Sequence, residues 1–194
     1  MAGLWRVTRN RYGRAAYEAL TARGLTATWM IEYVRALDTA SDPDDHRLDP
    51  DFRVEATDGS AVEPLDAPVE EVLDGEQVVA AFDGDTPLGY LFVSVDAALE
   101  VVPLERSLCF DGAYIRRVYV APEHRQRGVA SALLETACHL ARDRGGSRAT
   151  ALVALDNRPS RWLFEKHGFE PVRDYRYLRT GPLSVRSTRH RDTP

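Results

Sequence analysis

Apolar and polar positions are most regularly patterned in the second half of the chain. Residues 114–120 form a short apolar run that predicts a strand. Residues 129–144 follow, and their apolar side chains recur every three or four positions, which predicts an amphipathic helix. Residues 149–155 predict a buried strand, and a second helix is expected between Asn157, a suitable N-cap, and Gly168. The stripe of the first helix expected to face the core is Val129, Ala132, Leu133, Thr136, Ala137, Leu140 and Ala141.

The middle of the chain carries the pattern of a β-hairpin. Residues 77–82 and 87–95 predict two strands, and the sequence Asp83-Gly84-Asp85 between them predicts a turn. Weaker patterns predict a strand at 52–56, a short helix at 67–73 and closing strands at 169–172 and 175–178, while residues 97–112 are ambiguous. Strands and helices in this order favour an α/β or α+β layer fold built on a mixed sheet.

Both ends of the chain are expected to lie outside the main domain. Periodicity predicts a short strand at 4–8 and two helices, 11–23 and 26–37, broken near Gly24. This helical pair either packs on the main domain or forms a wall that covers a substrate. Residues 38–51 are rich in Asp and predict a solvated loop, and residues 186–191 a solvated basic tail. We therefore expect an N-terminal extension at 1–50, a main domain at 51–182 and a tail at 183–194.

Composition narrows the classes of function. The net charge of −5 over 194 residues disfavours a general nucleic-acid binder. Cys109 and Cys138 have no CxxC spacing and the histidines are scattered, so we expect two buried thiols and no metal site. No apolar run is long enough to span a membrane, and residues 1–9 lack the apolar segment of a signal peptide. These features favour a soluble cytoplasmic protein without a membrane partner.

The stretch Arg125 to Ala130 lies between a predicted strand and a predicted helix. Amides in the first turn of a helix have no partner within the helix, and the helix dipole places partial positive charge there, so the stretch predicts an anion site. It lacks the GxxxxGK string of a P-loop and the three glycines of a dinucleotide fingerprint. It does match Arg/Gln-x-x-Gly-x-Gly/Ala, through Arg125, Gly128 and Ala130.

A second motif follows the next strand, and the pair resembles a known family. Residues 157–169 fit a pattern of Asn, Ser, an aromatic, Lys, Gly and Phe, filled by Asn157, Ser160, Phe164, Lys166, Gly168 and Phe169. Together with Val120-Ala121-Pro122 and the preceding loop, this resembles the GNAT superfamily of acyl-CoA-dependent N-acetyltransferases. The resemblance covers residues 77–178 and implies a GNAT-like, mostly antiparallel sheet with helices on both faces.

The resemblance also implies how acetyl-CoA, as co-substrate, would be held. Amides of the loop would cradle its pyrophosphate, while the last residues of the preceding strand would bind the pantetheine arm through their backbone. Asn157 would face the same arm, although a simple N-cap is an equally open interpretation of this residue. The residues implied in acetyl-CoA binding are Val118, Tyr119, Val120, Arg125, Gln126, Arg127, Gly128, Val129, Ala130, Ser131, Asn157 and Ser160.

Catalytic residues are not identified by the sequence. Phe164 occupies a position where many family members have a Tyr that protonates the departing thiolate, and Phe cannot donate a proton. Positioning and a backbone amide on the thioester carbonyl could still support transfer. Tyr119, Tyr175 and Tyr177 are alternative acids, and a water chain is an alternative base. The base that would deprotonate the acceptor amine is undefined. Besides the water chain, three carboxylates that precede the strand at 114–120 could take this role: Glu100, Glu105 and Asp111.

The sequence therefore favours transfer of an acetyl group from acetyl-CoA to a primary amine, by direct attack in a ternary complex. The acceptor is a small molecule, a protein N-terminus or a lysine, and a homodimer is compatible with the sequence. A non-catalytic acyl-CoA-binding module is the alternative, because Phe164 and the missing base weaken the case for catalysis. A different nucleotide-binding enzyme is a third, weaker hypothesis.

Overall fold

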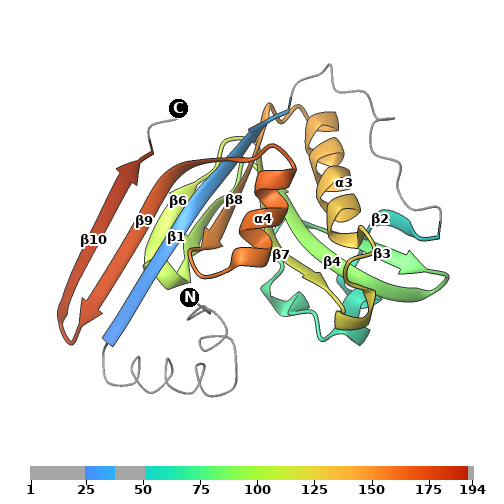
Figure 1. The fold of residues 1–194 in the computed structure, drawn as a ribbon, viewed down its shortest axis with the longest axis horizontal. Coiled ribbons are helices and arrows are strands. Elements are labelled where there is room, and N and C mark those ends of the chain that lie inside the picture. The colour runs from blue at the N-terminus through green and yellow to red at the C-terminus, as the bar shows by residue number, and fades with distance from the viewer. Residues whose placement is uncertain (1–24, 38–50, 192–194) are drawn as a thin grey trace. The chain divides into compact units, whose positions relative to one another are not determined.

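The hairpin, strand and helix expected in the middle of the chain are all present in the structure, a computed structural model that describes residues 25–37 and 51–191 (Figure 1). They are β3 (Gln77–Asp83), β4 (Thr86–Val95), β7 (Ala113–Val120) and α3 (Val129–Asp143). The chain divides into two units. The first comprises Met1–Tyr33, Leu99–Leu108 and Leu152–Pro194, and the second comprises Val34–Ala98 and Cys109–Ala151.

The second unit is built on a mixed sheet. Its strands lie in the order β8-β7-β4-β3-β2, with β2 at Arg53–Thr57 and β8 at Arg148–Ala154. The pairs β2–β3, β3–β4 and β4–β7 are antiparallel, while β7 and β8 are parallel. The expected mixed, mostly antiparallel sheet is therefore confirmed.

Helical elements pack on both faces of this sheet. The short 3-10 helix η2 (Gly59–Leu65) adds Val62 to a buried cluster with Val78, Ala80 and Phe92. Side chains alternate between the faces of a strand, so the intervening buried residues Val79 and Ala81 point the other way. Since α3 contacts β3, β4 and β7 and does not contribute to that cluster, we infer that it covers this opposite face. Two further short 3-10 helices are η3 (Val69–Glu71) and η5 (Pro122–His124).

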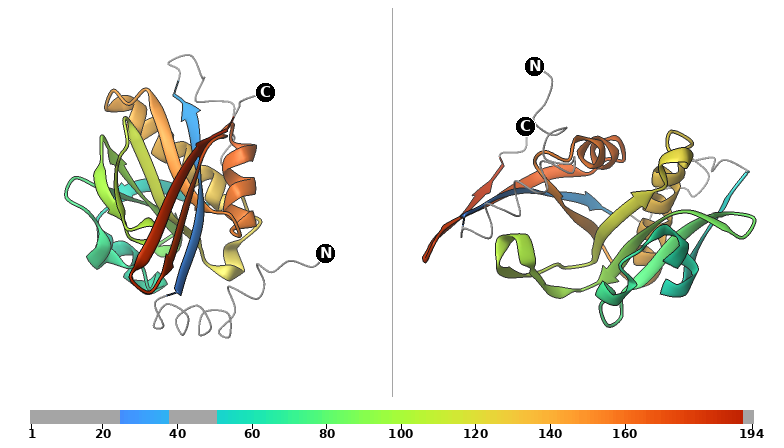
Figure 2. Two further views of the ribbon diagram at one scale, coloured as in Figure 1. Left: turned by 90° about the vertical axis from the view of Figure 1, so that its left-hand side faces the viewer. Right: turned by 90° about the horizontal axis from the view of Figure 1, so that it is seen from below.

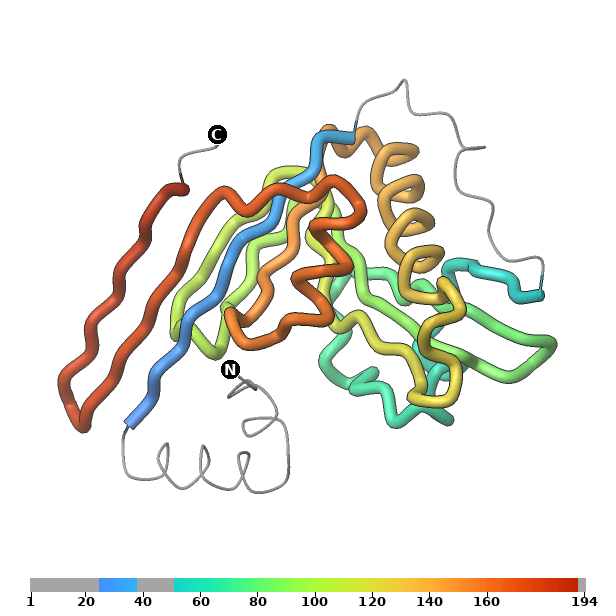
Figure 3. Tube along the Cα trace, viewed as in Figure 1, coloured from blue at the N-terminus to red at the C-terminus, as the bar shows by residue number. Residues whose placement is uncertain are grey.

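The first unit contains a three-stranded segment, a helix and a small separate sheet. Strands β10 (Leu183–His190), β9 (Glu170–Thr180) and β1 (Leu25–Ala36) lie in that order, and β9 and β10 form a long antiparallel hairpin (Figure 2). Helix α4 (Arg158–Lys166) connects β8 to β9, as the tube in Figure 3 traces. The small sheet pairs β5 (Ala98–Val101) with β6 (Arg106–Cys109) around the short helix η4 (Val102–Leu104).

The helix expected at 26–37 is wrong, because Leu25–Ala36 is a strand. Trp29, Ile31 and Tyr33 are spaced by two, and Ile31 and Tyr33 are fully buried on one face of the strand. Trp29 and Tyr33 are also four apart, so the same residues fit a helical stripe. β-branched residues at Thr26, Thr28 and Ile31 favour the extended form.

Other expectations need smaller corrections. Residues 186–190 are exposed as expected and Arg191 is half-buried, but residues 186–190 belong to β10 instead of a solvated tail. The two closing strands are one, β9, and the short helix at 67–73 is only the three residues of η3. Cys138 is buried, whereas Cys109 is exposed. The elements expected at 4–8 and 11–23, and the loop at 38–50, lie outside the described residues, and the domain boundaries at 50 and 182 stay a prediction.

Candidate functional site

Strand β7 is interrupted by a β-bulge in the second unit. Phe92 of β4 pairs with Arg116, but Tyr90, two residues away, pairs with Tyr119, so β7 carries one extra residue here. Arg117 lies inside this bulge with a φ of 57°, a left-handed conformation that is uncommon for a residue other than glycine. A bulge redirects backbone amides away from the strand ladder and is frequent beside active sites. The sequence did not predict this feature.

Past the bulge, one edge of β7 has no paired strand among the described residues. The parallel ladder with β8 joins Ala113 to Ala149, Tyr114 to Thr150 and Ile115 to Ala151, and no further residue of β7 pairs on that edge within the described residues. The three residues expected to bind pantetheine, Val118, Tyr119 and Val120, are half-buried and follow this point. Their outward backbone groups can therefore accept an extended ligand as an added strand.

The loop between β7 and α3 has the backbone of an anion site. Gln126 has a φ of 64° and Gly128 a φ of 84°, both in the left-handed region. Such alternation turns successive amides toward one side. Gly128 is the N-cap of α3 and no side chain caps this helix end. The first helical bond runs from the amide of Ala132 to the carbonyl of Gly128, so the amides of Val129 and Ala130 have no acceptor within the helix.

Gly128 fits a cradle for two separate reasons. Its positive φ strains any residue with a side chain. In addition, a Cβ placed on Gly128 would meet no atom within 4 Å, so the space in front of the loop is open. The motif match alone did not reveal this conformational requirement, which the structure adds. Loop and helix start together present amides and open space to an anion such as a pyrophosphate.

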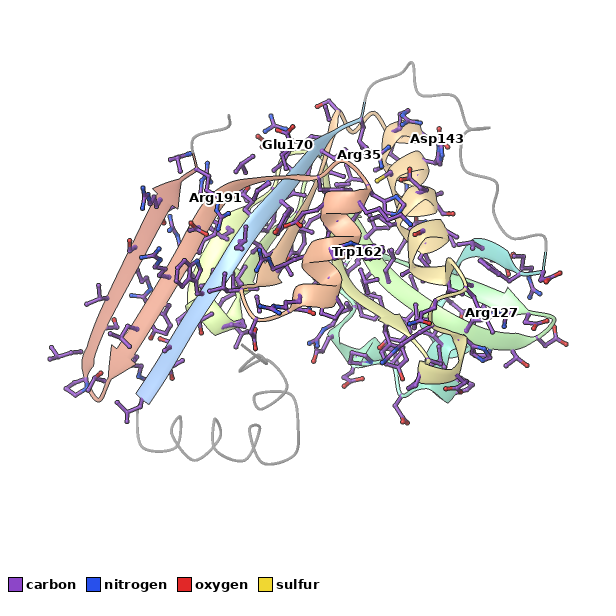
Figure 4. All side chains as sticks on the ribbon, viewed as in Figure 1. Arg35, Arg127, Asp143, Trp162, Glu170 and Arg191 are labelled. Atoms are coloured by element: carbon purple, nitrogen blue, oxygen red, sulfur yellow. The ribbon has the colours of Figure 1, made fainter. Side chains whose placement is uncertain are left out.

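The two arginines of the loop differ in their surroundings. Arg125 is exposed, and its Nε donates to the carbonyl oxygen of Val120 at 3.1 Å, which ties the loop to the end of β7. Arg127 is half-buried and lies at the turn that leads into α3 (Figure 4). The expected charge-assisted contact of Arg127 with a phosphate remains a prediction, while Arg125 also has a structural role.

Asn157 in the first unit is an N-cap. Its Oδ1 accepts from the amide of Ser160 at 3.5 Å, and its Nδ2 donates to the hydroxyl of Ser160 at 2.8 Å. The capping interpretation of Asn157 is therefore confirmed, and its bonds to Ser160 stabilise the start of α4. A role of Asn157 or Ser160 in binding acetyl-CoA remains a prediction.

Phe164 is a core residue of the first unit. Its ring stacks on Tyr33 at 6.3 Å between centroids and meets Phe169 edge-on at 5.0 Å. The hydroxyl of Tyr33 donates to Oε1 of Glu165 at 2.6 Å and accepts from Nε of Arg161 at 3.3 Å. Burial, followed by the bond to Glu165, raises the pKa of Tyr33. Tyr33 was missed because it was assigned to a helix, and its raised pKa makes it a weak acid.

Two of the three tyrosines suggested as acids, Tyr175 and Tyr177, also have a raised pKa. Tyr175 donates to Glu32 at 3.1 Å, and its pKa is raised chiefly by burial. The pKa of Tyr177 is raised chiefly by burial. Burial also raises the pKa of Tyr114, within β7, to about 12. None of these three groups has the lowered pKa expected of an efficient acid for a thiolate.

Two carboxylates beside the bulge were not predicted. Glu76 has a fully buried side chain whose oxygens accept from Nε and Nη2 of Arg116 and from the amide of Leu73, at 2.6 to 3.0 Å. Glu71, which is exposed, forms an ion pair with Arg117 in the bulge. The available signal was compositional, since residues 58–76 contain seven acidic and no basic residues, while β7 carries two adjacent arginines.

The three carboxylates expected upstream of β7 are exposed. Glu105 pairs with Arg179 at 2.9 Å in the first unit, and Asp111 pairs with Arg148 at 3.7 Å in the second. Glu100 lies on β5 with its side chain in solvent. Within the described residues, Glu71 is the carboxylate that forms an ion pair with the bulge residue itself, and a catalytic role for Glu100, Glu105 or Asp111 stays a prediction.

Comparisons with known proteins agree with this architecture. A family model described as "Acetyltransferase (GNAT) family" matches residues 46–169. The chain therefore belongs to the GNAT acetyltransferase family. A search of curated proteins finds no match.

Solved structures share the fold at low sequence identity. A Drosophila protein of 14% identity superposes with a TM-score of 0.58, covering 88% of this chain and 57% of that one. A putative GNAT acetyltransferase from Novosphingobium aromaticivorans has 17% identity and a TM-score of 0.56, covering 82% of this chain and 66% of that one. A tandem GNAT protein from the clavulanic acid biosynthesis pathway has 16% identity and a TM-score of 0.55, covering 90% of this chain and 60% of that one. This chain thus spans two thirds or less of each of these structures, and the likeness establishes the fold alone.

Two further observations concern partners. No helix within residues 25–37 and 51–191 is long and apolar enough to cross a membrane. Over the same residues, no three His, Cys, Asp or Glu side chains are grouped so that they could hold a metal ion.

Proposed function

We propose that this protein is an N-acetyltransferase that moves the acetyl group of acetyl-CoA to a primary amine. The observation that carries the proposal is the uncapped start of α3 behind the left-handed loop residues Gln126 and Gly128. This arrangement presents backbone amides to open space, as a pyrophosphate requires. Family membership supports the acetyl-group chemistry.

The chain would supply binding through three consecutive segments. Arg125 to Ser131 would hold the pyrophosphate, with Arg127 adding a charge-assisted contact. Val118, Tyr119 and Val120 would align the pantetheine arm along the open edge of β7. An amide freed by the bulge at Arg117 would polarise the thioester carbonyl and stabilise the oxyanion that forms on attack. Asn157 and Ser160 would assist from the second motif.

Proton transfer would rely little on dedicated acids. A thiol has an ordinary pKa of about 8.5, so a thiolate can leave without a strong proton donor and take its proton from water. Glu71, held by Arg117 at the bulge, is our candidate to accept the ammonium proton of the acceptor, directly or through water. Transfer would then occur by direct attack of the neutral amine in a ternary complex.

The acceptor would be a primary amine of a small molecule, a protein N-terminus or a lysine. We place the reaction in the cytoplasm, with no nucleic-acid, membrane or metal partner. Titration of the full chain with acetyl-CoA by calorimetry tests the donor. We expect one site per chain with a micromolar Kd, and no heat at millimolar acetyl-CoA would disprove the proposal.

The non-catalytic acyl-CoA-binding module is kept as a second candidate because Phe164 is buried among rings and offers no proton. CoA release with a panel of amines separates the two hypotheses. Release above the rate of hydrolysis supports the enzyme, whereas binding without turnover on any amine favours the module.

The role of Asn157 can be separated from its capping role. Asn157→Ser retains an N-cap residue, so we expect a change in unfolding free energy of only about 0.5 kcal/mol. If the side-chain amide of Asn157 contacts acetyl-CoA, the Kd for acetyl-CoA should rise by roughly 3- to 10-fold, which corresponds to the loss of about one neutral hydrogen bond. Calorimetry and thermal melting measure both quantities. An unchanged Kd would leave Asn157 with the cap alone.

A further inference from the structure

Strand β10 is the terminal strand of its sheet and is unusually accessible. It pairs on one side with β9 over eight consecutive residues, from Leu183 opposite Thr180 to His190 opposite Arg173. Every one of its residues is exposed, and no strand of the described residues pairs with its other side. The strand contains no proline and no bulge, two of the devices that keep an edge from pairing, although it carries Arg186 and Arg189.

One face of this hairpin also carries exposed apolar side chains near its turn. Leu178 of β9 lies opposite Val185 of β10, and these side chains are 54% and 65% exposed. Leu183, two residues away on the same face, is 73% exposed. Large apolar side chains grouped on a free edge strand indicate a contact surface better than scattered exposed residues do.

We propose that β10 pairs with β10 of a second copy of this chain, in an antiparallel arrangement centred on Ser187. The proposal is independent of the acetyltransferase activity. A twofold axis perpendicular to the sheet keeps each face continuous across the two copies. Residues that lie opposite each other across the axis then have numbers that are both odd or both even. One residue of the strand therefore lies on the axis, opposite the same residue of the second copy.

The charges on β10 determine which residue lies on the twofold axis. Centred on Ser187, Arg186 lies opposite Thr188 of the second copy, and Val185 lies opposite Arg189. Centred on Arg186, that arginine lies opposite its own copy, and centred on Thr188, only the five residues 186–190 of the strand pair. Like charges directly opposite each other on neighbouring strands are destabilising. The Ser187 register alone pairs seven residues, 184–190, without such a clash.

Arg186 is already held in its own chain, which lowers the cost of bringing two copies together. Its guanidinium donates to the carbonyl oxygen of Glu105 at 3.2 Å and lies 3.7 Å from the Glu105 carboxylate. It also covers the ring of Tyr177, 4.9 Å from the centroid. The positive charge closest to the proposed axis is therefore partly neutralised before association.

Cysteine cross-linking tests the register. In a Cys109→Ser background, which removes the exposed thiol, Ser187→Cys should give mainly disulfide-linked dimer under mild oxidation, because facing residues lie about 4.5–5.5 Å apart. Val185→Cys is the matched control on the same face. Its two copies would be displaced by four residues, about 13 Å along the strand, and should stay unlinked.

Sedimentation equilibrium of the unmodified chain tests the association itself. We expect dimer at micromolar concentration, at least tenfold weaker association for Ser187→Arg, and little change for Ser187→Thr. Hydrogen exchange of residues 184–190 should rise when the dimer dissociates. A monomer at 100 µM, equal cross-linking at 185 and 187, or a monomer in which 184–190 stay protected by another segment of the chain would each overturn the proposal.

Discussion

Replacing Gly128 with alanine should weaken acetyl-CoA binding about 10- to 100-fold. A Cβ at Gly128 would occupy the open space in front of the loop, where we propose that the pyrophosphate lies. The loss of one charge-assisted hydrogen bond from an amide costs about 1.5–3 kcal/mol, which corresponds to this range of Kd. Calorimetric titration with acetyl-CoA measures the change directly.

Gly145 is a matched control at the other end of α3. It has the same φ of 84°, and a Cβ there also meets no atom within 4 Å. Gly145→Ala should therefore lose the same stability as Gly128→Ala, about 1–2 kcal/mol for an alanine in left-handed conformation. Only Gly128→Ala should change the Kd. If both variants bind acetyl-CoA as tightly as the unmodified chain, the loop is not the pyrophosphate site.

The elements that the sequence predicted well are those with a local signal. The turn Asp83-Gly84-Asp85, the stripe along α3 and the caps of α4 each depend on residues within a few positions of one another. The loop at Arg125 to Ala130 was located for the same reason, since its motif is contiguous in sequence. Local signals of this kind are the part of a fold that patterns reveal best.

The failures share the opposite property. Whether 26–37 became a helix or a strand depended on neighbours far along the chain, such as Asp174, whose carboxylate accepts from the indole of Trp29 at 3.0 Å. The residues of β10 were predicted to form a solvated tail because none of their side chains is buried. Pairing with β9 keeps them extended instead. On the candidate site, the bulge at Arg117 follows from the register between β4 and β7, which no local motif encodes.

The ion pair between Glu76 and Arg116 joins residues 40 apart in sequence, and we expect its loss to have the largest effect on stability. Glu76→Gln keeps the shape of the side chain but removes the charge that faces Arg116. The guanidinium, itself only 16% exposed, would remain without that counter-ion. Breaking a buried pair in this way costs about 3–5 kcal/mol, or a fall in Tm of roughly 6–20 °C for a domain of this size.

Glu71→Gln is the control for this substitution. Glu71 pairs with the neighbouring Arg117 and lies 3.9 Å from Nη1 of Arg116, but the side chains of Glu71 and Arg117 are nearly half exposed. Exposed pairs contribute about 0–1 kcal/mol, so the Tm should fall by no more than a few degrees. The double variant Glu76→Leu with Arg116→Met removes both buried charges and should recover much of the lost stability. Thermal melting of the three variants at one pH measures these differences. Equal falls for Glu76→Gln and Glu71→Gln would contradict the assignment, because they would mean that water solvates Arg116 as well as it solvates Arg117.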